Sequence, residues 1–189
     1  VEGDLILIAP GTYREAVAVT VPGIVIRGLS RSAVVLDGGG ELEEGIRVTA
    51  DRVAVENLTI RDYTINGLRF AGTRPTGAAA DAPLRILEGY RASYVTAVDN
   101  GLYGVYAFAS RGGLIEHVYA SGSPDSGIYV GQCKPCDAVV RDSTAEYNAI
   151  GYEGTNAGGN LLIVSSTFTR NRVGITTNSD DTERLAPQR

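Results

Sequence analysis

One short unit recurs along the sequence, in which a glycine opens a strand-like segment that continues with an apolar residue. Its copies begin at Gly45, Gly67, Gly104, Gly127, Gly151 and Gly174. Successive copies lie 22, 37, 23, 24 and 23 residues apart. A unit this short cannot bury its own apolar face, so neighbouring units have to stack against one another. The sequence therefore predicts a solenoid with coils of about 23 residues.

The later coils carry further strand-like segments before the glycine, and no convincing helical periodicity is present. These segments cover residues 53–60, 113–120, 138–145 and 161–168. Short alternating runs bounded by Gly, Asn, Asp and Ser are typical of strands. Leucine-rich repeats would need a Leu-dense consensus, left-handed β-helices a hexapeptide rhythm, and an antiparallel sandwich would not keep the spacing constant. We expect an all-β protein: a right-handed, single-stranded parallel β-helix with three short strands per coil.

Stacked coils place equivalent residues in columns, about 4.8 Å apart, the spacing of paired strands. One inward column is expected to contain Ile46, Leu68, Val105, Ile128, Tyr152 and Ile175. A second inward column is expected to contain Val48, Phe70, Ala107, Val130 and Thr177. The outward column between them is expected to contain Arg47, Arg69, Tyr106, Tyr129, Glu153 and Thr176.

We expect the chain to form one β-helix domain over residues 1–189. The one long interval between repeats contains a Gly-, Ala- and Pro-rich stretch, residues 71–83, which indicates a loop inserted into one coil. The charged, Pro-containing tail at residues 180–189 is expected to cover one end of the solenoid, because open sheet edges invite aggregation. The sequence lacks an initiator Met and enters a strand-like run almost at once, which indicates a fragment or processed form.

Charge and hydropathy exclude two classes of partner. With 22 acidic and 17 basic residues the net charge is −5, and no basic stripe is available to neutralise phosphates, which argues against nucleic acid. No run of 18 apolar residues occurs, so no membrane-spanning helix is expected. Trp and Met are absent, and most bulky aromatic surface comes from 10 Tyr, a residue suited to half-buried or ligand-facing positions.

The densest polar and aromatic region falls between residues 100 and 156. Its candidate ligand-binding residues are Tyr103, Tyr106, Tyr129, Gln132, Glu153 and Asn156, with Asp125 beside them. Flat aromatic rings next to carboxylates and amides suit a sugar, because its C–H faces stack on rings while its hydroxyls form hydrogen bonds. The alternative is a ladder of Tyr rings that only stabilises the stacked coils.

Two pairs of carboxylates are candidates for catalysis. Hydrolysis of a glycoside needs two carboxyl groups about 5–9.5 Å apart, a distance that adjacent coils supply. Glu116 with Asp142 is one such pair, and Asp125 with Glu153 is the other. Any acidic β-helix contains pairs at this spacing, so whether the chain is an enzyme stays open. A lyase or epimerase would instead need a base beside an Arg or a Ca²⁺ ion, and Arg141 lies near Asp142 and Asp137 in the sequence.

The most distinctive local motif is Cys133-Lys134-Pro135-Cys136. Two thiols at this spacing indicate a redox pair, half of a zinc site or a small structural disulfide. A redox pair would need a helix after the first Cys, and zinc would need four ligands, of which only His117 could supply a third. A turn disulfide or two packed thiols are therefore favoured, and metal handling is kept as a weaker hypothesis.

The segment GDLILIAPGTY, residues 3–13, resembles the first coil of secreted right-handed β-helix proteins. Pectinesterase-like, pectate-lyase-like and NosD-like proteins begin in this way. The later repeats resemble the generic repeats of the carbohydrate-binding and sugar-hydrolase superfamily. The resemblance implies the fold, a polysaccharide ligand and an extracellular or periplasmic location, but a fold does not fix an activity.

The catalytic motifs of these relatives are missing. The pectinesterase segment G-x-x-D-F-I-F-G and the pectate lyase segment W-x-D-H have no counterpart. His117, the single His, lies outside the D-P-H-D setting of alginate epimerases and related lyases. Residues 178–181, Asn-Ser-Asp-Asp, echo the N-T-D run of polygalacturonases only superficially. The copper chemistry suggested by NosD-like relatives would need clusters of Met and His, which are absent.

The leading hypothesis is a secreted or envelope-associated bacterial β-helix that binds, and in one version also processes, a polysaccharide. The expected binding face carries Tyr106, Tyr129 and Glu153. A non-catalytic structural or adhesive β-helix is the alternative. A groove along this face would favour sugar binding, whereas a flat ladder of rings would favour the structural role.

Overall fold

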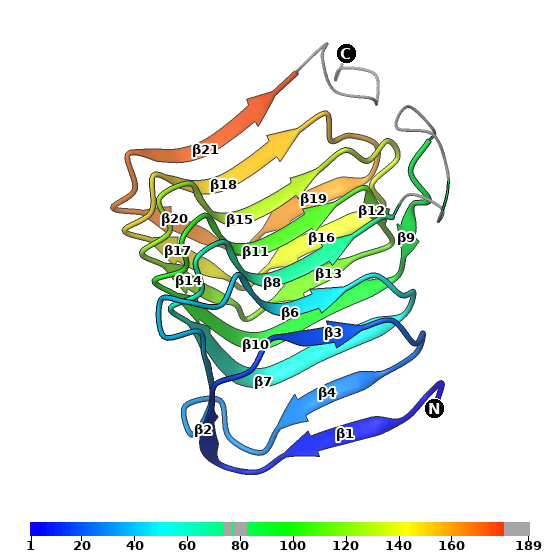
Figure 1. Cartoon of the computed structure of the whole chain (residues 1–189). Helices are drawn as coiled ribbons and strands as arrows, with labels where there is room; N and C mark the ends of the chain where they lie inside the picture. The colour runs from blue at the N-terminus through cyan, green and yellow to red at the C-terminus, as the bar shows by residue number, and fades with distance from the viewer. Residues whose placement is uncertain (74–76, 78–82, 180–189) are drawn as a thin grey trace.

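The computed structural model describes residues 1–73, 77 and 83–179, and every regular element in these residues is a β-strand (Figure 1). The strands wind around one apolar core in successive coils, with β1 at one end of the stack and β21 at the other (Figure 1). Equivalent strands of neighbouring coils pair in parallel throughout the two large sheets. The predicted parallel β-helix is confirmed.

Each coil contributes to three sides of the solenoid, and the first two sides belong to one sheet. The first side contains β1 (Leu5–Ile8), β4 (Val25–Gly28), β7 (Val53–Arg61), β10 (Tyr90–Val98), β13 (Leu114–Glu116), β16 (Ala138–Arg141) and β19 (Leu161–Val164). The second side contains β2 (Gly11–Tyr13), β5 (Val34–Asp37), β14 (Tyr119–Ser121), β17 (Thr144–Glu146) and β20 (Thr167–Thr169). The long strands β7 and β10 run through the corner and belong to both sides.

The third side is the second large sheet. It contains β3 (Val17–Val19), β6 (Glu44–Val48), β8 (Asn66–Ala71), β11 (Tyr103–Phe108), β15 (Ser126–Gly131), β18 (Ile150–Thr155) and β21 (Val173–Asn178). A small separate sheet pairs β9 (Leu87–Glu88) with β12 (Ser110–Arg111). Six of these strands, all except β3, carry the repeated glycine-strand unit of the sequence.

The register of this sheet confirms the predicted columns. The pairs of the first inward column are Ile46–Leu68, Leu68–Val105, Val105–Ile128, Ile128–Tyr152 and Tyr152–Ile175. The outward column also pairs as expected, from Arg47 through Tyr106 to Thr176. Gly154 pairs with Thr177 and so completes the second inward column. Ile175 is 53% exposed, since it lies on the last described coil.

The close approach of the next coil explains why glycine recurs at the start of these strands. A Cβ atom added to Gly45 would lie 2.5 Å from the carbonyl oxygen of Gly67. An added Cβ at Gly104 would lie 2.6 Å from the carbonyl oxygen of Gly127, and one at Gly151 would meet that of Gly174 at 2.6 Å. Only glycine leaves room for a neighbouring backbone at these distances. The sequence repeat therefore reflects the packing of one coil on the next.

The predicted inserted loop begins and ends at an antiparallel bridge between Thr73 and Arg85. The amide nitrogen of Arg85 donates to the carbonyl of Thr73 at 2.7 Å, and the reverse bond measures 3.1 Å. Most of the loop predicted at residues 71–83, and the whole tail predicted at residues 180–189, lie outside the described residues. Both remain predictions.

Candidate functional site

A hollow of about 490 Å³ lies on the outer face of the second large sheet, where the aromatic residues gather. Four neighbouring strands, β11, β15, β18 and β21, supply most of its walls. It is lined by Tyr103, Tyr106, Tyr129, Glu153, Thr155, Asn178 and Ser179. We call this surface the tyrosine groove. Four of the residues expected to bind a ligand, Tyr103, Tyr106, Tyr129 and Glu153, are thus brought together in one place.

The tyrosine rings of the groove stack along the coil axis. The ring centroids of Tyr106 and Tyr129 lie 4.7 Å apart with an angle of 24° between the planes. Within the single strand β11, the ring of Tyr103 lies 4.6 Å from that of Tyr106, and Phe108 stacks on Tyr106 at 5.7 Å. Tyr129 is only 4% exposed, whereas Tyr106 is half-buried. Tyr106 therefore offers accessible ring surface, and Tyr129 mainly supports it.

Glu153 is a carboxylate held in one orientation by its neighbours. The hydroxyl of Ser126 donates to Oε2 at 2.6 Å. The side-chain amide of Asn178 donates to Oε1 at 2.9 Å, and the hydroxyl of Thr155 lies 3.2 Å from the same oxygen. Hydrogen bonds to a carboxylate fix its geometry. Glu153 is thereby positioned as an acceptor at the wall of the groove.

A second carboxylate, Asp125, lies beside Glu153. The Ser126 hydroxyl is 3.0 Å from Oδ1 of Asp125, so it sits between the two carboxylates. The phenol of Tyr103 also bonds to Asp125. Burial raises the pKa of Tyr103 well above its ordinary value, and the charges of Asp125 and Glu153 raise it further. Tyr103 therefore stays protonated and acts as a donor.

Two of the expected binding residues do not line the tyrosine groove. Gln132 is 2% exposed and Asn156 is fully buried, at corners that follow β15 and β18. Both have a left-handed backbone, with φ of 54° and 47°. Their side chains cannot meet a polymer on the outer face, so the expectation that they contact a ligand is not supported. Gln132 and Asn156 stand two residues after Val130 and Gly154 of the second inward column, so alternation along the strand already places them on the inner side.

Three residues of the groove were missed by sequence reasoning: Thr155, Asn178 and Ser179. A signal for two of them was present. Thr155 stands two residues after Glu153 on the same strand and so faces the same side. Asn178 is the register partner of Thr155 on the next coil.

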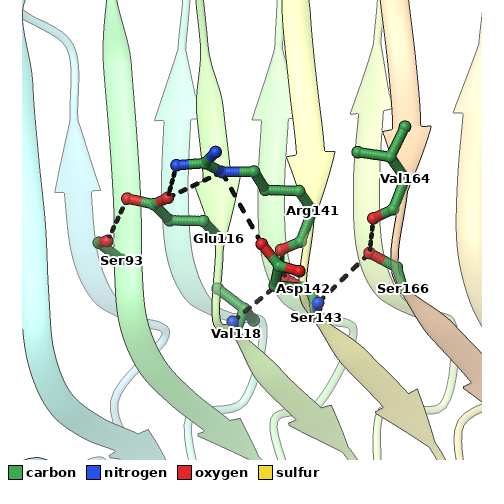
Figure 2. A network of polar contacts seen from close by, with 8 residues as sticks. All are labelled: Ser93, Glu116, Val118, Arg141, Asp142, Ser143, Val164 and Ser166. Carbon is green, nitrogen blue, oxygen red and sulfur yellow. Dashed lines mark hydrogen bonds and ion pairs between the residues drawn. The ribbon is translucent and has the colours of Figure 1, made fainter.

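The other candidate carboxylates, Glu116 and Asp142, both lie next to Arg141. Figure 2 shows Glu116 between Ser93 and Arg141, on neighbouring strands of the first side. The hydroxyl of Ser93 donates to Oε1 at 2.7 Å, and Arg141 donates to Oε2 through Nε at 3.0 Å. Asp142 is one residue beyond the strand and lies 4.0 Å from Nε of Arg141. One guanidinium thus lies next to both carboxylates.

The environment of Glu116 also opposes a role as a general acid. Burial alone would raise the pKa of this carboxyl, but the hydrogen bonds from Ser93 and Arg141 and the charge of Arg141 outweigh burial. The pKa of Glu116 is consequently below its ordinary value. The side chain is a structural ion pair of the solenoid wall.

Glu116→Gln is expected to make the free energy of unfolding depend less steeply on pH at acid pH. Because the folded pKa lies below the ordinary value of 4.5, the carboxylate contributes fully above that pH. Its contribution is lost as the pH falls through the folded pKa. Urea denaturation between about pH 5 and pH 2 measures the effect, and the wild type should lose stability more steeply than the variant. Parallel profiles of the two proteins would contradict this.

Calcium and other metals have no ligand set in the part of the chain that the structure describes. No group of three or more His, Cys, Asp or Glu side chains is arranged there to hold an ion. Arg141 is engaged by Glu116, and Asp137 accepts from the amide of Asn160 at 2.9 Å. Of the lyase-like arrangement considered for Arg141, Asp137 and Asp142, the structure brings Asp142 to 4.0 Å from Arg141, whose guanidinium is also bound by Glu116.

Cys133 and Cys136 form a disulfide, with their Cα atoms 4.7 Å apart. Both residues are buried, in the corner that follows β15. Sulfur atoms bonded to each other leave no thiolate to hold a metal, so the structure does not support metal handling through this pair.

Residues 1–73, 77 and 83–179 contain no helix of the length and apolar character needed to cross a bilayer.

A family model described as "Right handed beta helix region" matches residues 18–184. This match covers most of the chain and agrees with the parallel coils described above. A search of curated proteins gave no match.

Two solved structures share the fold at low sequence identity. A protein from Parabacteroides merdae, provisionally assigned as a glycosyl hydrolase, superimposes with a TM-score of 0.58 at 12% identity, over 93% of this chain and 83% of the other. The A-module of a mannuronan C-5 epimerase from Azotobacter vinelandii gives 0.52 at 13% identity, over 95% of this chain and 59% of the module. The chain thus spans little more than half of the epimerase module. Likeness at this level concerns the fold alone.

Proposed function

We propose that this chain, which belongs to the right-handed β-helix family, binds a polysaccharide along the tyrosine groove. One observation carries the proposal: the stacked Tyr rings of the outward column border an open hollow, and a fixed carboxylate forms part of its wall. Aromatic rings beside oriented polar groups are the usual means of holding a sugar.

The contacts of the groove assign a role to each side chain. The half-exposed ring of Tyr106 stacks under the C–H face of a sugar, and Tyr129 supports this ring from the next coil. Glu153 accepts hydrogen bonds from sugar hydroxyls. Asn178 and Thr155 hold Glu153 in place from neighbouring positions. Because the groove crosses several coils, it suits a polymer better than a single sugar.

Two further observations support the proposal. The provisional glycosyl hydrolase and the mannuronan epimerase are, by their names, proteins that act on carbohydrate, and they share this fold. The Cys133–Cys136 disulfide favours an oxidising compartment, in agreement with an extracellular or periplasmic location.

A second candidate function is cleavage or modification of the bound polymer. The observation that favours it is the placement of Asp125 and Glu153 on either side of the Ser126 hydroxyl, next to a protonated Tyr103. Two nearby carboxylates are the minimum for glycoside hydrolysis. The test is to incubate the polymer with the wild type, with Asp125→Asn and with Glu153→Gln, and to analyse the cleavage products. If the two carboxylates catalyse hydrolysis, the wild type forms products and neither variant does.

Tyr106→Ala is expected to weaken binding about tenfold, or about 1.4 kcal/mol, because the stacking platform is removed. A glycan array with the wild type first identifies the polysaccharide, and isothermal titration then measures the affinity of each variant. The matched control is Tyr147→Asn, which removes a 57% exposed Tyr from a corner outside the groove.

The control is expected to bind like the wild type. Equal affinity of Tyr106→Ala and Tyr147→Asn would contradict the proposed groove. A wild type that binds no glycan would favour the structural or adhesive role instead.

A further inference from the structure

The corner between the first and second sides carries a column of residues with left-handed backbone. Its members are Asn57, Tyr94, His117, Asp142 and Ser165, with φ of 57°, 55°, 51°, 50° and 48°. Asn and Asp tolerate this conformation, but a bulky aromatic residue adopts it rarely. Tyr94 is nevertheless placed there and is 48% exposed. Tyr147 shares this backbone conformation and this exposure at another corner, so the case for Tyr94 rests on what surrounds its ring.

The ring of Tyr94 has one covered face and one face that borders a hollow. His117 of the next coil stacks on it, with centroids 4.4 Å apart and planes at 17°. Toward the preceding coil stands Asn57, whose side-chain amide donates to the carbonyl of Gly28 at 2.8 Å. A hollow of about 430 Å³ lies here, lined by Arg27, Glu56, Asn57, Ser93 and Tyr94. A flat ring at the wall of a hollow is a stacking platform for a sugar.

Polar groups line the base of this hollow. Glu56 is 7% exposed and accepts from Nε of Arg27 at 2.6 Å. Its other oxygen forms an ion pair with Arg91. One buried carboxylate is therefore shared by two guanidinium groups, and the pair of arginines carries an excess of positive charge.

A third guanidinium approaches the same corner from the other side. Arg31 donates through Nη2 to the carbonyl of Val95 at 2.9 Å and through Nε to the hydroxyl of Thr96 at 2.8 Å. Within the described part of the chain, no ion pair joins Arg31 to a carboxylate. Burial lowers the pKa of Arg31, and the nearby phenol of Tyr94 opposes this shift. A partly desolvated cation bound only to neutral oxygens attracts an anion strongly.

We infer that this corner is a second carbohydrate site, which binds a sugar unit that carries a carboxylate. The sugar ring stacks on Tyr94, and its carboxylate pairs with the guanidinium of Arg31. Arg27 and Arg91 share the carboxylate of Glu56, and Arg31 adds a third guanidinium, so these four side chains carry a net positive charge in a chain whose net charge is −5. The other carboxylate beside the hollow, Glu116, accepts from Ser93 and is balanced by Arg141. The tyrosine groove lies on the other large sheet, across the core (Figure 1). The two sites are therefore separate.

The test is isothermal titration with three defined ligands: oligogalacturonate, oligomannuronate and a neutral cello-oligosaccharide. Tyr94→Asn is expected to weaken binding of the better acidic ligand about tenfold, since Asn suits the left-handed backbone and the variant should fold. Tyr147→Asn is the matched control, because Tyr147 is also exposed and has φ of 59°. Arg31→Gln should weaken acidic binding about tenfold, and Arg31→Lys should retain part of it.

Equal affinity of Tyr94→Asn and Tyr147→Asn would overturn the inference. Equal affinity of acidic and neutral ligands, or an unchanged affinity in Arg31→Gln, would also overturn it. Tyr106→Ala separates this site from the tyrosine groove. Weaker binding in Tyr106→Ala with unchanged binding in Tyr94→Asn would support a site in the tyrosine groove and contradict the site at the corner. Weaker binding in Tyr94→Asn with unchanged binding in Tyr106→Ala would support the corner and contradict the groove.

Discussion

Gly104→Ala is expected to lower the free energy of unfolding by about 1–3 kcal/mol. The added methyl carbon would lie 2.6 Å from the carbonyl oxygen of Gly127 and 3.2 Å from Cβ of Ala120. A neighbouring backbone cannot yield as a flexible side chain does, so adjacent coils would have to move apart. Urea denaturation followed by circular dichroism measures the loss as a lower midpoint.

Gly174→Ala is the matched control for this substitution. Gly174 occupies the same place in the repeat, but its nearest contact would be the carbonyl oxygen of Phe168 at 3.3 Å. We expect little change in its midpoint. If Gly104→Ala and Gly174→Ala unfolded at the same urea concentration, close coil packing would not be the reason for the repeated glycine.

Asn148→Ala is expected to lower the free energy of unfolding by about 2–4 kcal/mol, the largest loss that we expect from a polar residue. Asn148 is 4% exposed and bonds to backbone groups of two coils. Its Oδ1 accepts from the amide of Ser123 at 2.9 Å, and its Nδ2 donates to the carbonyl of Ala120 at 3.2 Å. Removal of the side chain leaves both buried groups without these partners. Urea denaturation again gives the measurement.

The control for Asn148→Ala is Asn160→Ala. Asn160 is an exposed corner residue with φ of 53°, and its amide donates to Asp137 on the surface. We expect a loss of less than about 1 kcal/mol there. Similar losses at both positions would contradict the view that the buried amide of Asn148 stabilises the coils.

The sequence predicted the fold in detail because a solenoid repeats its own local geometry. Each coil buries the same positions. Ile46, Leu68 and Val105 each follow a repeated glycine directly, and this shared position in the sequence predicts that they form one column. A Gly at the head of each strand also reports the close approach of the next backbone. Local pattern and global packing carry the same information in such a fold.

The candidate sites were only partly predictable, because they depend on corners and on long side chains. Tyr106 and Glu153 followed from alternation along a strand, whereas Gln132 and Asn156 were expected on the outer face although the same alternation places them on the inner side. The partner of Glu116 is Arg141 instead of Asp142, which differs by one residue of register. Arg31 reaches Val95 and Thr96 across an intervening coil, a distance that no spacing in the sequence reveals.

The most direct measurement of the central proposal is a ¹H–¹⁵N NMR titration of the labelled protein with the polysaccharide fragment chosen on the array. The side-chain amide of Asn178, which donates to Glu153, is the reporter inside the tyrosine groove. We expect saturable shifts at this amide and at the backbone amides of Glu153 and Thr155, with the affinity found by calorimetry. Saturable binding that leaves these signals unmoved would contradict a polysaccharide site in the tyrosine groove.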